Sequence, residues 1–231
     1  MPVPFQNRFD AGRQLAQKLL EYVDMPTTDV LGLPRGGVPV AYEVAIQLNQ
    51  PLDVFLVRKL GVPDHEELAM GAVASGGVRV LNQSVIYGLD ISEEAIDDET
   101  RRELAVIQQR ERDYRGDQPP LRINGRTIIL IDDGLATGST MLAAVAALRQ
   151  KNPAKIVVGV PVASREACRE VGSHVDQIVC LATPEPFYAV GQWYLEFGET
   201  SDAEVRDLLR RARRRAGVWT PPPEEDLPRT G

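Results

Sequence analysis

The sequence predicts an α/β fold, an open and mainly parallel twisted sheet flanked by helices. The apolar run 128–131 has no polar alternation, which is typical of a strand covered on both faces in a parallel sheet. Patterns with helical spacing follow such runs, so strands and helices alternate along the chain. The 231 residues, 43% of them hydrophobic, supply enough apolar side chains for one core with a small appendage.

Strands are expected where apolar residues cluster. We place them at 30–33, 52–59, 71–81, 128–131, 156–162 and 177–181. Residues 1–217 are interpreted as a single domain, in which about 58–116 and 183–200 form an inserted part that we call the hood. The segment 218–231 contains three consecutive prolines and is predicted to be a disordered tail.

The segment 92–115 is predicted to be an inserted helix. Ser92 is a favoured N-cap residue, and the acidic Glu93 and Glu94 follow it. The segment is highly charged with sparse apolar residues, so a solvated helix is the default interpretation. The alternatives are a helix that covers a functional site as part of the hood and a helix that mediates a subunit contact.

The loop after the strand 128–131 carries the strongest functional signal. Its sequence is Asp132-Asp133-Gly134-Leu135-Ala136-Thr137-Gly138-Ser139-Thr140, and apolar residues at helical spacing follow it. At a helix N-terminus, free N–H groups and the helix dipole favour a phosphate, and Thr137, Ser139 and Thr140 add hydroxyl donors. The loop therefore predicts a phosphate site.

Asp132 and Asp133 require a different role, because carboxylates repel a phosphate. They can accept hydrogen bonds from a sugar diol, so ribose 5-phosphate fits the loop as a whole. The alternative is an ordinary strand-to-helix connection in which the two acids only cap the helix. The loop lacks the Gly-Lys-Ser/Thr of a nucleotide-binding P-loop, and the chain has no G-x-G-x-x-G dinucleotide turn.

These residues resemble the phosphoribosyl pyrophosphate (PRPP) motif of type I phosphoribosyltransferases: an apolar strand, two acids, three variable residues and Thr-Gly-x-Thr. The version in this chain is closest to the adenine phosphoribosyltransferase type. The resemblance implies that Asp132 and Asp133 hold the ribose hydroxyls and that the following loop binds the 5-phosphate. The implied PRPP-binding residues of this loop are Asp132, Asp133, Gly134, Leu135, Ala136, Thr137, Gly138, Ser139 and Thr140.

A second glycine-rich turn, Arg35-Gly36-Gly37, follows the strand 30–33. A guanidinium and exposed amides would counter the negative charges of a pyrophosphate with bidentate geometry. The alternative is a tight turn with a solvated arginine. The turn resembles the family's pyrophosphate loop, which often has a non-proline cis peptide, and the resemblance implies that Arg35, Gly36 and Gly37 bind PRPP.

Arg58 and Lys59 end the strand 52–59, and the segment 60–70 is rich in Gly, Pro and acidic residues. This pattern resembles the strand, Arg-Lys pair and mobile loop of adenine and orotate phosphoribosyltransferases, in which the loop closes over PRPP. Such lids exclude water. The loop lacks the later catalytic lysine of the orotate enzymes, so His65 is its candidate cation, with a solvated histidine as the default.

The segment 183–194 holds four aromatic residues, Phe187, Tyr188, Trp193 and Tyr194. In a chain with 6% aromatic residues, this concentration after a strand suggests a platform for a flat ring. A hydrophobic plug is an equal alternative for Trp193 and Tyr194. Phe187 resembles the Phe that stacks on the base in hypoxanthine-guanine enzymes. The identity of the acceptor base stays open. Hypoxanthine-guanine enzymes recognise a purine with an Asp, where this chain has Ala136, and with a Lys on a later strand, which the matching strand 156–162 does not contain.

The resemblance implies a Mg²⁺-dependent transferase that moves the 5-phosphoribosyl group of PRPP to a nitrogenous base, as in nucleotide salvage. Mg²⁺ would bind mainly through PRPP, with Asp132 and Asp133 as candidate protein ligands. A homodimer is expected. The implied catalytic residues, which place charge on the sugar and the leaving group, are Arg35, Arg58, Lys59, Asp132 and Asp133.

The net charge of −7 argues against nucleic-acid binding, but a C-terminal helix concentrates Arg206, Arg210, Arg211, Arg213, Arg214 and Arg215. Their default role is to complement the helix dipole. The rival function is a PRPP- or nucleotide-sensing regulator that binds RNA or DNA, as in some members of the family. The chain shows no signal peptide or membrane span, so we expect a cytoplasmic protein in which Cys168 and Cys180 are reduced core residues.

Overall fold

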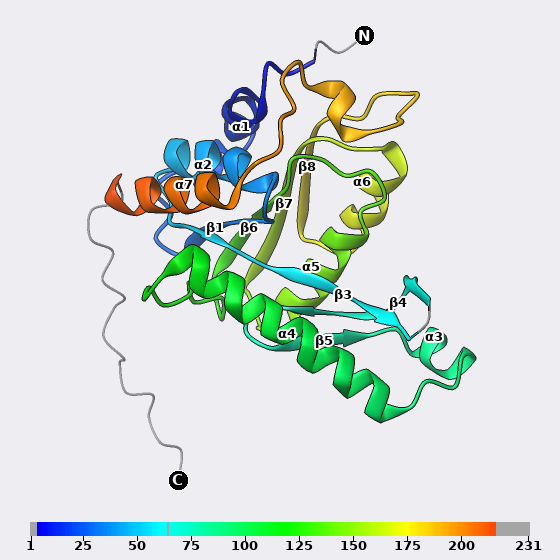
Figure 1. The fold of residues 1–231 in the computed structure, drawn as a ribbon. Helices are drawn as coiled ribbons and strands as arrows, with labels where there is room; N and C mark the ends of the chain where they lie inside the picture. The colour runs from blue at the N-terminus through cyan, green and yellow to red at the C-terminus, as the bar shows by residue number, and fades with distance from the viewer. Residues whose placement is uncertain (1–3, 64, 216–231) are drawn as a thin grey trace.

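A computed structural model describes residues 4–63 and 65–215 of the chain, and the predicted tail at 218–231 lies outside them. The core is a five-stranded sheet with the strand order β2-β1-β6-β7-β8 (Figure 1). Every pair of neighbours in it is parallel. The strands are β1 (Thr28–Gly32), β2 (Leu52–Val54), β6 (Thr127–Ile131), β7 (Lys155–Val162) and β8 (Gln177–Ala182).

Helices cover both faces of this sheet, which confirms the predicted fold class. On one side lie α1 (Arg8–Ala16), α2 (Gly37–Leu48) and α7 (Asp202–Arg215), and on the other lie α5 (Ser139–Arg149) and α6 (Arg165–Gly172) (Figure 1). Alternate residues of β6 pack into two different hydrophobic clusters. Ile129 and Ile131 pack in the cluster that includes α1, α2 and α7, whereas Ile128 and Leu130 pack in the cluster that includes α5 and α6. The continuous apolar run of β6 is therefore explained by burial on both faces.

A second, antiparallel sheet of three strands has the order β3-β4-β5. Its strands are β3 (Val57–Val62), β4 (His65–Ala74) and β5 (Val78–Leu81), followed by α3 (Gln83–Gly88) and α4 (Glu93–Arg115). In Figure 1, α4 runs along this sheet at the side of the molecule away from α6. Two short 3-10 helices complete the described elements, η1 (Leu20–Tyr22) and η2 (Val190–Trp193).

The single strand predicted at 52–59 is wrong, because the chain changes pairing partners within it. Phe55 N–H still donates to Gly32 O of β1, at 3.1 Å. Leu56 instead pairs with Ser75, whose Oγ accepts from Leu56 N–H at 2.9 Å, and from there the chain enters the antiparallel sheet. The predicted loop 60–70 is wrong in part for the same reason, since β3 and β4 together take up most of it.

Helix α4 confirms the predicted inserted helix, but it is more than a solvated one. The Ser92 side chain caps its N-terminus by accepting from Ala95 N–H at 3.2 Å. Ile107 is buried in the main cluster, and Arg115 forms a buried ion pair with Asp53 of β2 at 2.8 Å. This contact joins the C-terminal end of α4 to β2 of the main sheet. It is costly to break, because removal of one partner would leave the other charge buried and uncompensated.

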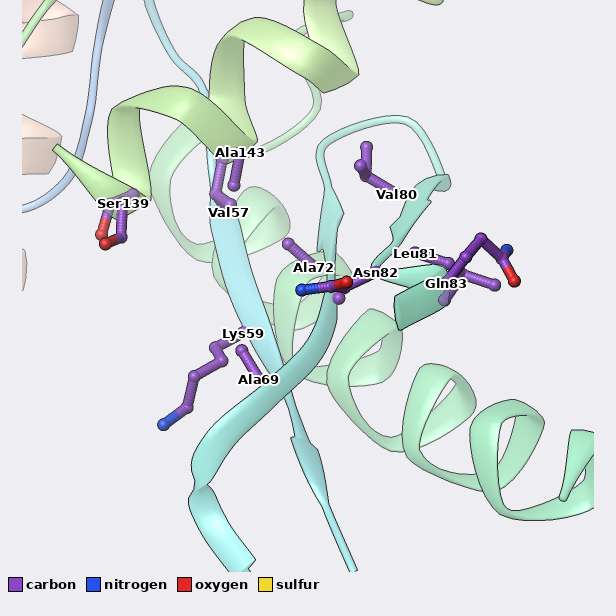
Figure 2. A pocket seen from close by; sticks show the side chains of 12 residues that line it. Val57, Lys59, Ala69, Ala72, Val80, Leu81, Asn82, Gln83, Ser139 and Ala143 are labelled. Atoms are coloured by element: carbon purple, nitrogen blue, oxygen red, sulfur yellow. The ribbon is translucent and has the colours of Figure 1, made fainter. Parts of the chain in front are cut away.

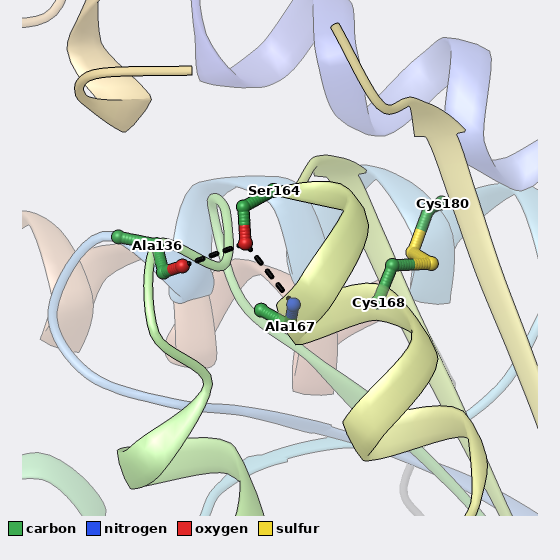
Figure 3. The surroundings of a disulfide bond; sticks show 5 residues. All are labelled: Ala136, Ser164, Ala167, Cys168 and Cys180. Carbon is green, nitrogen blue, oxygen red and sulfur yellow. Dashed lines mark hydrogen bonds between the residues drawn. A yellow bond between two sulfur atoms is a disulfide. The ribbon is translucent and has the colours of Figure 1, made fainter. Parts of the chain in front are cut away.

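The two cysteines correct a prediction. Cys168 of α6 and Cys180 of β8 form a disulfide, with their Cα atoms 6.8 Å apart (Figure 3), where reduced side chains were expected. Their separation of 12 residues gave no sign that α6 folds back onto β8.

None of the described helices is both long and apolar enough to cross a membrane.

Candidate active site

Two loops meet at the carboxyl end of the parallel sheet. β1 and β6 are neighbours in register, with Gly32 opposite Ile131, so the loops that follow them start side by side. The first loop connects β1 to α2, and the second connects β6 to α5. A hydrogen bond from Leu33 N–H to Ile131 O, 2.9 Å long, joins the first residue after β1 to the last residue of β6. This edge of an open α/β sheet is where ligands usually bind.

Gly36 and Gly37 let the two loops touch. A Cβ atom on Gly36 would lie 2.1 Å from Asp133 Oδ2, and a Cβ atom on Gly37 would lie 2.7 Å from Ile131 O and 2.9 Å from Asp132 Cα. No side chain fits at either position without displacing the acidic loop. The predicted pyrophosphate loop and the predicted ribose residues are therefore in direct contact.

Each acid of the pair uses one oxygen within the protein. Asp132 Oδ1 accepts from Asp133 N–H at 2.8 Å, and Asp133 Oδ2 accepts from Arg8 Nε at 2.8 Å. Tyr194 completes the anchoring by donating its hydroxyl to the Asp133 backbone oxygen at 2.6 Å. Within the described residues, nothing donates a hydrogen bond to Asp132 Oδ2 or to Asp133 Oδ1. The pair thus offers two acceptor oxygens on neighbouring residues.

Burial makes it costly to ionise the Asp132 and Asp133 carboxyl groups. It raises the pKa of Asp132 well above its ordinary value, and the nearby charge of Asp133 raises it further. Burial also raises the pKa of Asp133, while the charge and the hydrogen bond of Arg8 oppose that rise. Two half-buried acids side by side at the carboxyl end of the sheet are costly to ionise, and such groups are typical of functional sites.

The backbone of the phosphate loop is held from behind by β7 and α6. Leu135 N–H donates to Val162 O at 2.9 Å, and Ser164 N–H donates to Leu135 O at 2.8 Å. The Ser164 hydroxyl donates to Ala136 O at 2.8 Å and also accepts from Ala167 N–H at the start of α6 (Figure 3). These bonds fix the predicted residues Leu135 and Ala136 from the protein side.

The other half of the loop faces outward. Gly138 has a φ of 76°, a left-handed conformation that glycine adopts readily, and stands as the N-cap residue of α5. Thr137, Ser139 and Thr140 are exposed around this helix start, and the hydroxyls of Thr137 and Ser139 lie 3.1 Å apart. Exposed hydroxyls, the first amides of α5 and the positive end of its dipole would favour an anion at this position.

Arg35 lies in the β1–α2 loop and is partly exposed. Its guanidinium pairs with Glu199, a largely exposed side chain of the segment before α7. The peptide bond between Pro34 and Arg35 is cis. A ligand that binds the Arg35 guanidinium must therefore displace the Glu199 carboxylate.

Arg58 and Lys59 have different surroundings. Arg58 Nε pairs with Glu103 of α4, and that hydrogen bond raises the pKa of Arg58. Lys59 is exposed and, with Ser139 and Thr140, lines a mainly apolar cavity of about 540 Å³ between the antiparallel sheet and α5 (Figure 2). Of the two cations, Lys59 thus lines a cavity that reaches the first residues of α5, while Arg58 is bound to α4. His65 is exposed at the start of β4.

The aromatic segment packs together. Phe187 and Trp193 are partly buried against a small cluster that includes Phe5 and Tyr194. Tyr194 is buried, and the centroids of its ring and the Phe5 ring lie 5.6 Å apart. Tyr194 therefore both fills this cluster and anchors Asp133, whereas Tyr188 is exposed. The stacking role of Phe187 stays a prediction.

Sequence reasoning missed several side chains at this site. Arg8 contacts Asp133 from 125 residues away, and Phe197 and Glu199 reach the site from the segment before α7. No local pattern marks them, because an isolated arginine or glutamate at the surface of a helix or loop is ordinary. Ser164 carried the only local signal, since it precedes a helix as a favoured N-cap residue.

The chain was compared with protein families and with known proteins. The model of the phosphoribosyl transferase domain matches residues 4–192. The protein named "Putative phosphoribosyl transferase Rv0571c" from Mycobacterium tuberculosis strain H37Rv is 46% identical over 210 residues, which are 91% of this chain and 47% of that protein. Its counterpart in strain CDC 1551 matches equally well. The chain thus spans about half the length of the curated relatives it matches, 47% by residue count.

Among solved structures, TT1426 from Thermus thermophilus is similar over its whole length. It has 40% sequence identity and a TM-score of 0.80, with 90% of this chain and 99% of that chain covered. The match to the family model covers more than half of the chain and includes both loops described above. The chain belongs to the phosphoribosyl transferase family.

Proposed function

We propose that this protein transfers the 5-phosphoribosyl group of PRPP to a nitrogenous base and releases pyrophosphate. The observation that carries the proposal is the contact between Gly36 and the Asp133 carboxylate. In PRPP the ribose and the pyrophosphate share the C1–oxygen bond, so a site for the sugar must adjoin a site for the leaving group. The two loops meet this requirement, because no side chain separates them.

The free oxygens of the acidic pair suit a diol. Asp132 Oδ2 and Asp133 Oδ1 would each accept from one hydroxyl of the ribose, while their other oxygens keep their protein partners. Thr137, Ser139, Thr140 and the first amides of α5 would bind the 5-phosphate. Arg35 with the Gly36 and Gly37 amides would bind the pyrophosphate.

In the reaction that this family performs, the ribose gains positive character as pyrophosphate leaves and the base attacks C1. The chain would contribute placement and charge: Asp132 and Asp133 beside the sugar, Arg35 on the leaving group. Lys59 has no ion-pair partner among the described residues and lines the cavity that reaches Ser139 and Thr140, so it is the cation we favour for a phosphate. Arg58 would have to leave Glu103 before it reached a phosphate. No protein nucleophile is needed.

Mg²⁺ is part of this proposal, and the acidic loop fits it. Oxygen ligands are those that Mg²⁺ prefers, and Asp132 and Asp133 supply them. The described part of the chain has no group of three or more His, Cys, Asp or Glu side chains suited to hold a metal alone, so phosphate oxygens of PRPP would complete the coordination. When bound, Mg²⁺ would neutralise charge on the leaving pyrophosphate.

We also propose the setting of the reaction, a cytoplasmic homodimer in nucleotide salvage whose single domain spans 1–217. Light scattering during gel filtration tests the dimer directly. The rival, a nucleic-acid-binding sensor, is less well supported, because several α7 arginines have partners within the protein. Arg210 and Arg211 pair with Asp207, and Arg213 donates to Arg115 O at 3.2 Å.

The function is tested by measuring pyrophosphate release from Mg-PRPP with a panel of purine, pyrimidine and nicotinate-type bases. We expect release with at least one base and none without a base. The Phe187→Ala variant should need more base for half-maximal rate at unchanged PRPP affinity if Phe187 stacks on the acceptor. An active variant with an unchanged base requirement would leave Phe187 as a packing residue. PRPP binding without release for any base would support the sensor instead.

The pyrophosphate assignment has its own test. Arg35→Ala should weaken the binding of PRPP and pyrophosphate, and leave that of ribose 5-phosphate nearly unchanged, because ribose 5-phosphate has no leaving group. Glu199→Gln is the matched opposite: it removes the carboxylate that competes for Arg35 and should tighten pyrophosphate binding by at most about fivefold, as expected for an exposed ion pair. Calorimetric titration measures both. An equal loss for both ligands in Arg35→Ala would indicate a purely structural arginine.

A further inference from the structure

Arg8 is the first residue of α1, and its side chain is directed into the candidate site. Its Nε donates to Asp133 Oδ2 at 2.8 Å and its Nη1 donates to Gly198 O at 2.6 Å. The guanidinium carbon also lies 3.9 Å from the centroid of the Phe197 ring. The side chain is only 12% exposed. A guanidinium with a carboxylate, a carbonyl and an aromatic face around it has little freedom to move.

These contacts fix the rotation of the Asp133 carboxylate. The carboxylate torsion of an aspartate is soft, so an unrestrained group would turn. Here Oδ2 lies between Arg8 Nε and Gly36, where even a single added carbon would overlap with it. With Oδ2 enclosed, Oδ1 is the oxygen left for a ligand.

We propose that Arg8 is a positioning residue of the ribose site, which holds the Asp133 carboxylate with Oδ1 turned toward the sugar hydroxyls. Phe197 and Gly198 hold Arg8 in turn, so the segment before α7 takes part in ribose binding without touching the sugar. This inference rests on the proposed function, because it assumes that Asp133 binds the ribose. It adds a residue from α1 to the site and gives the segment at 197–198 a role.

A positioning role for Arg8 and a merely structural ion pair predict different effects on ligand affinity. A structural pair affects folding, and its loss would weaken every ligand alike or none. A positioning residue affects the ligand that contacts its partner. Ribose 5-phosphate, which reaches Asp133, should therefore respond to changes at Arg8, and pyrophosphate, which reaches the Arg35 loop, should not.

The experiment is calorimetric titration of ribose 5-phosphate and of pyrophosphate into Arg8→Gln, Arg8→Lys and Arg13→Gln. Arg13 is the matched control, since it lies on the same helix in an exposed pair with Glu43. For Arg8→Gln we expect ribose 5-phosphate binding to weaken about tenfold or more, the range for a hydrogen bond between charged groups. Pyrophosphate binding should stay within about twofold of the wild type. Arg8→Lys should recover part of the loss, and Arg13→Gln should bind both ligands normally.

A double-variant cycle completes the test. If Arg8 acts through Asp133, adding Arg8→Gln to Asp133→Asn should cause little further loss of ribose 5-phosphate affinity. Unchanged ribose 5-phosphate binding in Arg8→Gln, or equal losses for the two ligands, would overturn the inference. If Arg8→Gln does not fold, Arg8→Lys decides by the same selective loss. A wild-type protein that binds neither ligand would contradict the proposed function itself, a result distinct from failure at Arg8.

Discussion

Replacing Gly36 by alanine should remove most of the protein's affinity for PRPP while leaving it folded. The backbone at Gly36 has a φ of −62° and a ψ of −32°, which alanine adopts without strain. The added carbon would nevertheless lie 2.1 Å from Asp133 Oδ2 and 3.3 Å from Arg8 Nε. Asp133 must move, because no other atom in this contact can yield as easily, and the sugar then loses an aligned acceptor.

We expect PRPP affinity to fall roughly a hundredfold, which corresponds to about 2.7 kcal/mol. Calorimetric titration of Mg-PRPP measures the loss, and thermal unfolding monitors the fold. The matched control is Gly88→Ala, because a Cβ atom at Gly88 meets nothing within 4 Å. Near-normal PRPP binding by Gly36→Ala would mean that the two loops do not have to touch for binding, which removes the observation on which the proposed function depends.

Asp132→Asn should have opposite effects on binding and on stability. The amide retains an oxygen to accept from Asp133 N–H but removes a half-buried charge that lies next to another. PRPP affinity should fall steeply, because the ribose hydroxyl loses a charged acceptor. The ligand-free protein should unfold at a higher temperature than the wild type, because a functional charge often costs stability.

The stability gain of Asp132→Asn should depend on pH. The folded-state pKa of Asp132 is raised above the unfolded value, so the folded protein holds this proton more tightly. The carboxylate therefore costs little at low pH, and its cost appears as the pH rises past the ordinary pKa of an aspartate. The asparagine side chain of the variant cannot ionise, so the difference in unfolding temperature should widen from acidic to neutral pH. A variant less stable than the wild type at neutral pH would show that the Asp132 charge is compensated.

The features that local sequence encodes were predictable. The apolar run of β6, the acidic loop after it and the glycine turn after β1 are each short, contiguous segments of the sequence. The two loops meet because β1 and β6 are parallel neighbours whose carboxyl ends lie at the same end of the sheet. The inserted helix α4 was predictable from its cap and its charge pattern. For these elements, local chemistry and fold agree.

Features that depend on tertiary contacts were not predictable. Arg8 and Asp133 meet across 125 residues, and Arg35 and Glu199 across 164. The break between β2 and β3 was hidden because its residues favour a strand throughout, and only the change of partner at Leu56 divides them. The disulfide depends on how α6 packs on β8. In each case the deciding contact comes from a distant segment of the chain.

The central claim is that one PRPP molecule lies across two adjoining loops, its ribose 5-phosphate part on the acidic loop and its pyrophosphate part on the Arg35 loop. A competition titration in the presence of Mg²⁺ tests it most directly. Ribose 5-phosphate and pyrophosphate should each displace PRPP, and neither should displace the other, because they occupy different halves of the same site. If the two compounds exclude each other, or if either fails to compete with PRPP, the two loops do not form a single PRPP site.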